Sequence, residues 1–202
     1  MGADSAGRGE MKLIERRDAG TVTQTDGKKI LGYAAVFGPL SEDLGGFREK
    51  IAPGAFDYAL NSKTDIRAFV DHDSSKILGR SSIGTLKLST DNQGLQVEID
   101  PPDTSYSRDL QTLLTRGDIS QMSFGFLVRP GGETWEVVDG QRIRTLTDLD
   151  LIEVSVVTIP AYPDTSVALR SLNSIRDWES RKRKLWFLQN RYRVSKKLKS
   201  EK

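Results

Sequence analysis

The chain has 202 residues, one histidine, no cysteine and a formal net charge of +2. This length suits one domain with appendages, and it is enough to bury a hydrophobic core without staples. The absence of cysteine excludes disulfides and thiol catalysis, and a lone histidine argues against a typical zinc site. No apolar run approaches the length of a membrane span. We therefore expect a soluble cytosolic protein that uses no metal, no cofactor and no membrane.

Charge divides the chain into two parts. Residues 176–202 hold 11 Lys and Arg against 3 Asp and Glu, a net charge of +8, whereas residues 1–175 hold 19 against 25, a net charge of −6. The first residues are mostly Gly, Ala, Ser and charged residues, which predicts a disordered leader over 1–11, and the helical, basic pattern at the other end predicts a basic helical tail over 173–202. Between them we expect one folded domain over 12–172.

Most predicted elements are short strands that end at turn residues. The turn signals are 91–94 and Asp139-Gly140, and Gly117 should end a helix. In chain order we predict a strand over 29–37, a short helix after 51–56 through Ala59 and Leu60, strands over 64–72, 84–89 and 95–99, a helix capped by Asp103-Thr104 that runs through Arg116, and strands over 119–128, 133–138 and 142–158. A β-rich body with few helices favours a barrel or sandwich over a parallel α/β sheet.

His72 is the only histidine, and it stands at the end of the predicted strand 64–72. Imidazole is the usual general base near neutral pH, so any such role in this chain falls to His72. A lone histidine can equally be an ordinary structural or surface residue.

Ser123 lies in a segment of alternating polar and apolar residues. Alternate residues of a strand share a face, so Met122, Phe124 and Phe126 should pack in the core while Ser123 points the other way. Gly125 shares the face of Ser123 and would leave room for a substrate backbone. The arrangement suits a nucleophile, although serines on strands are common for other reasons.

Glu153 stands among Ile152, Val154, Val156 and Val157 in the last predicted strand. A carboxylate in so apolar a strand needs a partner, because burying it unpaired is unfavourable. The single histidine could be that partner; alternatively, Glu153 faces solvent.

Ser123, His72 and Glu153 would together form a catalytic triad. In a triad the histidine takes the hydroxyl proton and later protonates the leaving amine, and the carboxylate orients the histidine. The chain order here is His, Ser, Glu, which differs from the orders of chymotrypsin, subtilisin and the α/β-hydrolases, and there is no G-x-S-x-G elbow.

Ordered blocks over about residues 12–172 resemble the phage prohead (capsid maturation) proteases of the HK97 type, which are related in fold to the herpesvirus assemblins. The blocks are GYAAVF at 32–37, GFRE at 46–49, IAPGAF at 51–56, DHD at 71–73, LGR at 78–80, GL at 94–95, GDISQMSFGF at 117–126, EVSVV at 153–157 and PAYP at 160–163.

The resemblance implies a mainly β fold with helices (α+β), an assemblin-like closed or nearly closed β-barrel surrounded by helices. It also implies a serine endopeptidase in which His72 is the base and Ser123 the nucleophile. Backbone N–H groups near Phe124-Gly125 or near Gly79-Arg80 are the candidate oxyanion donors.

The third triad member follows less directly from the resemblance. The herpesvirus relatives use a second histidine, and this chain has none. A carboxylate is expected instead, and we choose Glu153, with Asp148 and Asp150 as alternatives. Ser120 and Ser155 are the alternative nucleophiles.

The resemblance further implies the substrates and the place of action. The substrates would be the scaffold, the scaffold-like N-terminal part of the major capsid protein, and the protease itself by autocleavage. The expected place is the inside of the immature phage prohead in the host cytoplasm, and the expected assembly is a homodimer.

The basic tail leaves several functions open. It could dock on its own body or in a dimer, carry the protease to scaffold or shell, or bind nucleic acid, although no recognition motif supports the last. The competing functions are a catalytically silent capsid assembly or scaffolding protein that binds the shell through the tail, and a nucleic-acid-binding module.

Overall fold

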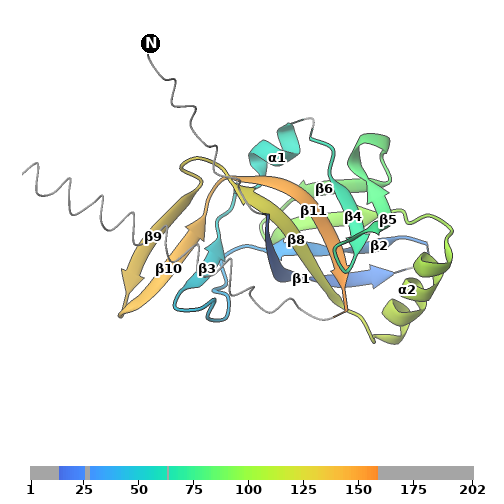
Figure 1. Ribbon diagram of the computed structural model, residues 1–202, viewed down its shortest axis with the longest axis horizontal. Helices are drawn as coiled ribbons and strands as arrows, with labels where there is room; N and C mark the ends of the chain where they lie inside the picture. Colours follow the sequence, from blue (N-terminus) through green and yellow to red (C-terminus); the bar gives the residue numbers. More distant parts are fainter. Residues whose placement is uncertain (1–13, 26–27, 63, 159–202) are drawn as a thin grey trace, which may run out of the picture. The chain divides into compact units, whose positions relative to one another are not determined.

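The computed structural model describes residues 14–25, 28–62 and 64–158. The predicted leader over 1–11 and the predicted helical tail over 173–202 lie outside the described residues. Within them the chain forms two sheets, two α-helices and one short 3₁₀ helix (Figure 1). The elements are β1 (Glu15–Thr25), β2 (Ile30–Val36), β3 (Arg48–Ile51), α1 (Asp57–Asn61), β4 (Arg67–Val70), β5 (Asp73–Arg80), the 3₁₀ helix (Ser81–Ile83), β6 (Leu86–Thr90), β7 (Gly94–Ile99), α2 (Ser105–Arg116), β8 (Gln121–Val128), β9 (Glu133–Val138), β10 (Gln141–Leu146) and β11 (Leu149–Val157).

Eight strands form one large sheet in the order β5-β4-β11-β8-β1-β2-β7-β6. Its edge strands, β5 and β6, are connected through the 3₁₀ helix, and the backbone N–H of Arg80 donates to Thr85 Oγ1 at 2.9 Å across that connection. A β-carbon on Gly79 would lie 2.6 Å from the carbonyl oxygen of Thr85, so the two edges come close here. The sheet is nearly closed into a barrel with a few helices, which confirms the predicted fold class.

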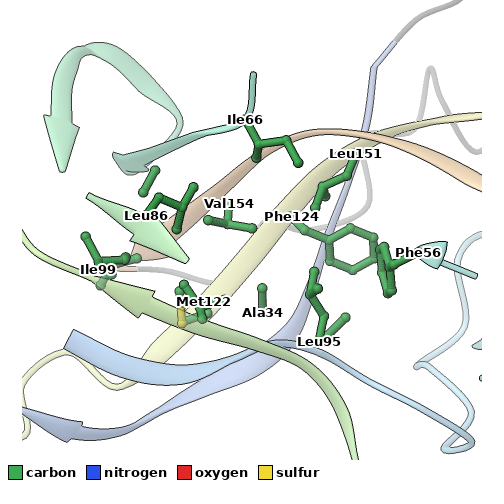
Figure 2. Packing of buried hydrophobic residues seen from close by; sticks show 14 of the residues in the cluster. Ala34, Phe56, Ile66, Leu86, Leu95, Ile99, Met122, Phe124, Leu151 and Val154 are labelled. Atoms are coloured by element: carbon green, nitrogen blue, oxygen red, sulfur yellow. The ribbon is translucent and has the colours of Figure 1, made fainter. Parts of the chain in front are cut away.

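The inner face of the barrel holds the hydrophobic core. Met122, Phe124 and Phe126 on β8 have no exposed surface, as the alternating pattern predicts. The ring of Phe124 packs edge-on against Phe56, with the centroids 5.5 Å apart (Figure 2). Because the inner side chains of β8 are fixed in this way, the side chains between them must lie on the outer face of the barrel.

The sequence predicts some of the residues at which helices and strands end. Helix α2 ends at Gly117 with φ 83°, the left-handed C-cap that the sequence predicts. Its N-cap position is Thr104, but the Thr104 hydroxyl donates to Ser107 Oγ at 3.1 Å and makes no cap to the backbone, so the predicted side-chain cap is wrong. The β9–β10 turn has positive φ at Asp139 and Gly140, as expected for a tight hairpin.

Several predicted boundaries are wrong. Strands β1, β3 and β5 are not predicted, because polar and charged residues dominate them. The predicted strand 142–158 is two strands, because the chain turns where the N–H groups of Thr147 and Asp148 both donate to the carbonyl oxygen of Gly132. The predicted strand 64–72 is shorter, since β4 ends at Val70 and the next two residues form a turn.

A network of charged side chains joins the small sheet, β3-β10-β9, to β1. Arg144 on β10 lies 2.6 Å from Glu133 on β9, 2.9 Å from Glu49 on β3 and 2.7 Å from Glu15 on β1. Arg17 on β1 lies 2.7 Å from Glu49 and 2.8 Å from Glu15. Arg144 and Glu49 are buried, so each must find its partners inside the protein rather than in water.

The network holds the carboxylate of Glu15 in the charged form. Burial raises the pKa of Glu15, but hydrogen bonds and charge attraction from Arg144 and Arg17 outweigh burial, and the pKa stays below its ordinary value of 4.5. A carboxyl whose pKa is lowered by folding stabilises the fold above its unfolded-state pKa. That contribution is lost as the pH falls through the folded-state pKa.

Replacing Arg144 with methionine should lower the free energy of unfolding by about 3–5 kcal/mol at neutral pH. Glu15 and Glu49 would then share the guanidinium group of Arg17, and Glu133 would lose its ion pair with Arg144. Urea unfolding measures this difference. The difference in unfolding free energy between the variant and the parent should shrink as the pH falls toward about 4, because carboxyl groups that have lost their ion pair then take up protons. Arg108→Met is the control, because Arg108 and its partner Asp103 are both exposed, and it should cost below about 1 kcal/mol. An equally small loss in Arg144→Met would contradict the role of the network.

Candidate active site

His72 lies in a two-residue turn between β4 and β5. Val70 pairs with Asp73, and the two residues between them have positive φ, 49° at Asp71 and 57° at His72. Two consecutive left-handed residues are the geometry of a type I′ hairpin turn, which Asn-Gly or Asp-Gly usually occupies. A non-glycine residue in this region is strained, and such strain concentrates at functional sites.

The turn carries the imidazole of His72 to the carboxylate of Glu153 on β11. His72 Nδ1 lies 2.6 Å from Glu153 Oε1, and both side chains are largely removed from solvent. An ionised carboxylate only accepts hydrogen bonds, so Nδ1 carries the proton and donates it to Glu153. In neutral imidazole the other ring nitrogen, Nε2, is then a free acceptor. The structure therefore brings together two of the three predicted site residues.

Glu153 has two further partners on the outer face of the barrel. Ser155 Oγ donates to Glu153 Oε2 at 2.6 Å, and Arg16 Nε on β1 lies 3.6 Å from Glu153 Oε1. Between β1 and β11 lies Gly125 of β8, which pairs with both Arg16 and Glu153. A β-carbon on Gly125 would lie 2.6 Å from Glu153 Oε1. The room beside Gly125 is filled by this carboxylate, so the predicted opening for a substrate backbone is wrong.

Ser123 lies on β8 directly opposite Ser155 of β11, two residues along from the pair of Gly125 and Glu153 and on the same face. Its side chain is fully buried. Ser123 Oγ and His72 Nε2 are both buried polar atoms, and within the described part of the chain neither has a hydrogen-bond partner. Ser120 precedes β8 and is exposed, away from this paired row.

The alternative carboxylates have other partners. Asp148 and Asp150 bind the guanidinium group of Arg129, at 3.0 Å and 2.8 Å. The backbone N–H of Arg80, one candidate oxyanion donor, is already bound to the Thr85 hydroxyl. Ser155, the other alternative nucleophile, directs its own proton to Glu153.

The sequence did not reveal Arg16 and Ser155 as partners of Glu153. Arg16 could not be identified from the sequence, because β1 lacks the alternation of polar and apolar residues that predicts a strand. Ser155 did carry a signal, since it stands two residues after Glu153 and so shares its face in any strand.

The sequence of the chain matches the model of a known protein family. The model of the caudovirus prohead serine protease family matches residues 14–180, a span that includes His72, Ser123 and Glu153. The chain belongs to this family. Searches of the curated proteins and of the solved structures gave no match.

Membership in the prohead protease family makes the chain a serine protease of capsid maturation in bacteriophages. The resemblance inferred from the ordered blocks is thereby confirmed. Across residues 14–25, 28–62 and 64–158, no helix is long and apolar enough to cross a membrane. In the same ranges, no group of three or more Asp, Glu or His side chains could hold a metal ion.

Gly125→Ala should break the hydrogen bond between His72 and Glu153, because the added methyl group would overlap the Glu153 side chain. The one histidine of the untagged protein gives one set of ring signals, so ¹⁵N–¹H spectra report its Nδ1 proton directly. We expect the slowly exchanging Nδ1–H signal to disappear in the variant. The core methyl signals serve as the control and should persist. An unchanged ring spectrum would show that Gly125 makes no room for the carboxylate.

Proposed function

We propose that Ser123 is the nucleophile of this protease, His72 its general base and Glu153 the carboxylate that orients His72. The observation that carries the proposal is the 2.6 Å hydrogen bond from His72 Nδ1 to Glu153 Oε1. It fixes the tautomer in which Nε2 has the lone pair, and that is the form that can accept a proton from a serine hydroxyl.

The proposed reaction uses each group in turn. Ser123 Oγ attacks the carbonyl carbon of the scissile peptide bond while its proton passes to His72 Nε2. Glu153 stabilises the resulting imidazolium, which then gives the proton to the leaving amine as the acyl-enzyme forms. In the second half a water molecule loses a proton to Nε2 and attacks the ester, and Ser123 recovers its proton.

The two unpaired atoms support this assignment. A buried polar atom without a partner costs about 1–3 kcal/mol, so structures keep few of them. Here one is a hydroxyl and the other a ring nitrogen that accepts, so they are chemically matched to each other. Catalytic hydrogen bonds are often open in free enzymes and tighten with substrate. Since Ser123 has no exposed surface, neighbouring groups must move before a substrate can reach it.

The proposed substrates follow from the family. Capsid proteins are the natural targets of a prohead protease, and we infer that the scaffold and the scaffold-like N-terminal part of the major capsid protein are cleaved, together with the protease itself. Cleavage inside the immature shell would let the fragments leave before DNA enters. A silent scaffolding protein is the weaker alternative, because such a protein has no need to keep a buried histidine–carboxylate hydrogen bond.

Ser123→Ala and His72→Ala should each lower turnover by roughly 10⁴–10⁶-fold while the barrel still folds. The measurement is coexpression with the capsid and scaffold proteins, followed by mass spectrometry of the fragments. Two other serines test whether the loss is specific to Ser123, with Ser120 as the control. Ser120→Ala should cleave normally, because Ser120 is exposed and outside the site. Ser155→Ala should lose less than Ser123→Ala, because it keeps the proposed nucleophile and base and removes one hydrogen bond to Glu153. Normal processing by Ser123→Ala would refute the assignment.

Glu153→Gln should lower turnover by about 10³–10⁴-fold, because a neutral amide neither stabilises the imidazolium nor holds Nδ1–H as the donor. The readout is the rate of cleavage of a peptide that spans a capsid processing site. Asp150→Asn is the matched control, since Asp150 binds Arg129 rather than His72. Near-normal rates in Glu153→Gln would assign the third role to another residue.

A further inference from the structure

We propose that Asp71 is a positioning residue that clamps the turn bearing His72 onto the end of β11. The inference rests on the proposed role of His72 as the base. Asp71 does not touch the reacting atoms; it would act by holding the imidazole at a fixed place relative to Glu153.

The clamp consists of three hydrogen bonds to the same strand end. Asp71 Oδ1 accepts the backbone N–H of Thr158 at 2.7 Å and the Thr158 hydroxyl at 3.0 Å. The backbone N–H of Asp71 donates to the carbonyl oxygen of Val156 at 2.9 Å. His72 itself is bound to Glu153 further back on β11. One strand therefore holds both residues of the turn, at two separate points.

The turn needs such a clamp because of its own conformation. Both of its residues are in the left-handed region, where neither aspartate nor histidine is as favourable as glycine. One of the two positions is occupied by the base, so only Asp71 can supply a side chain from within the turn. Asp71 is exposed, so burial does not require its carboxylate to find these partners. These hydrogen bonds therefore stabilise the conformation of the turn rather than the hydrophobic core.

The conformation of the turn determines where the imidazole of His72 lies. A small rotation of the turn would change the distance from His72 Nε2 to Ser123, and a displacement of about 1 Å can lower a rate by roughly 10²-fold. Loss of the clamp should therefore act on kcat, and it should leave substrate binding and global stability nearly unchanged.

Three variants separate the clamp from backbone strain. Asp71→Gly keeps the positive φ and removes the carboxylate, Asp71→Asn keeps both an acceptor oxygen and tolerance of positive φ, and Asp73→Gly is the matched control one step past the turn. Asp73 directs its carboxylate to Ser75 of its own strand. For peptide cleavage we expect Asp71→Gly to lose about 10–100-fold in kcat with KM within about twofold. Asp71→Asn and Asp73→Gly should stay within about threefold of the parent.

The ring signals of His72 provide a readout that does not depend on catalysis. In Asp71→Gly the Nδ1–H signal should broaden or shift, while Tm stays close to that of the parent; in Asp71→Asn both should persist. Unchanged kcat and unchanged ring signals in Asp71→Gly would overturn the clamp. It would also be overturned if glycine and asparagine variants lost activity equally, in step with Tm. If Ser123→Ala remained active, the proposed function would fail, and the ring signals would still decide on the clamp.

Discussion

The hydrogen bond between His72 and the buried carboxylate of Glu153 requires a particular arrangement of several parts of the fold. It needs β4 parallel to β11, so that the turn after β4 reaches the outer face of β11. It also needs a residue without a side chain at position 125, where the carboxylate lies. The hydroxyl of Ser155 and the guanidinium group of Arg16 supply the remaining contacts of that carboxylate. The proposed base, the proposed orienting carboxylate and the strained turn thus depend on one another.

The barrel wall separates the polar candidate site on its outer face from the hydrophobic core on its inner face. On β8 and β11 the inner residues, such as Phe124 and Val154, pack the core, and the outer residues form the candidate site. The period of two lets one strand pair serve both tasks. Within the described residues the fold also buries acidic side chains in the charged network around Arg144, which joins the small sheet to β1. In both places a buried carboxylate has more than one partner, which is the condition for burying it at all.

The sequence predicts the parts that depend on local pattern. Alternation reveals β8 and the inner residues Met122 and Phe124, and the ordered family blocks point to His72, Ser123 and Glu153. Strands β1 and β3 escape prediction, because their charged residues find partners on distant strands and no local pattern records those partners. Strand β5 escapes prediction because its first half is polar and largely exposed. The turn at Asp71 and His72 escapes for a related reason: it has no glycine, and contacts with β11 hold its conformation. Gly125 leaves space as predicted, but the carboxylate of Glu153 on the neighbouring strand fills that space, so it is no opening for a substrate.

The proposed role of Ser123 as the nucleophile activated by His72 can be tested chemically. A cleavage-competent preparation is treated with a small fluorophosphonate, and the modified serine is located by peptide mass spectrometry. We expect one adduct, on Ser123, which appears in step with the loss of cleavage and is absent from His72→Ala. Complete inactivation with the adduct on Ser120 or Ser155, or full labelling of Ser123 in His72→Ala, would contradict it.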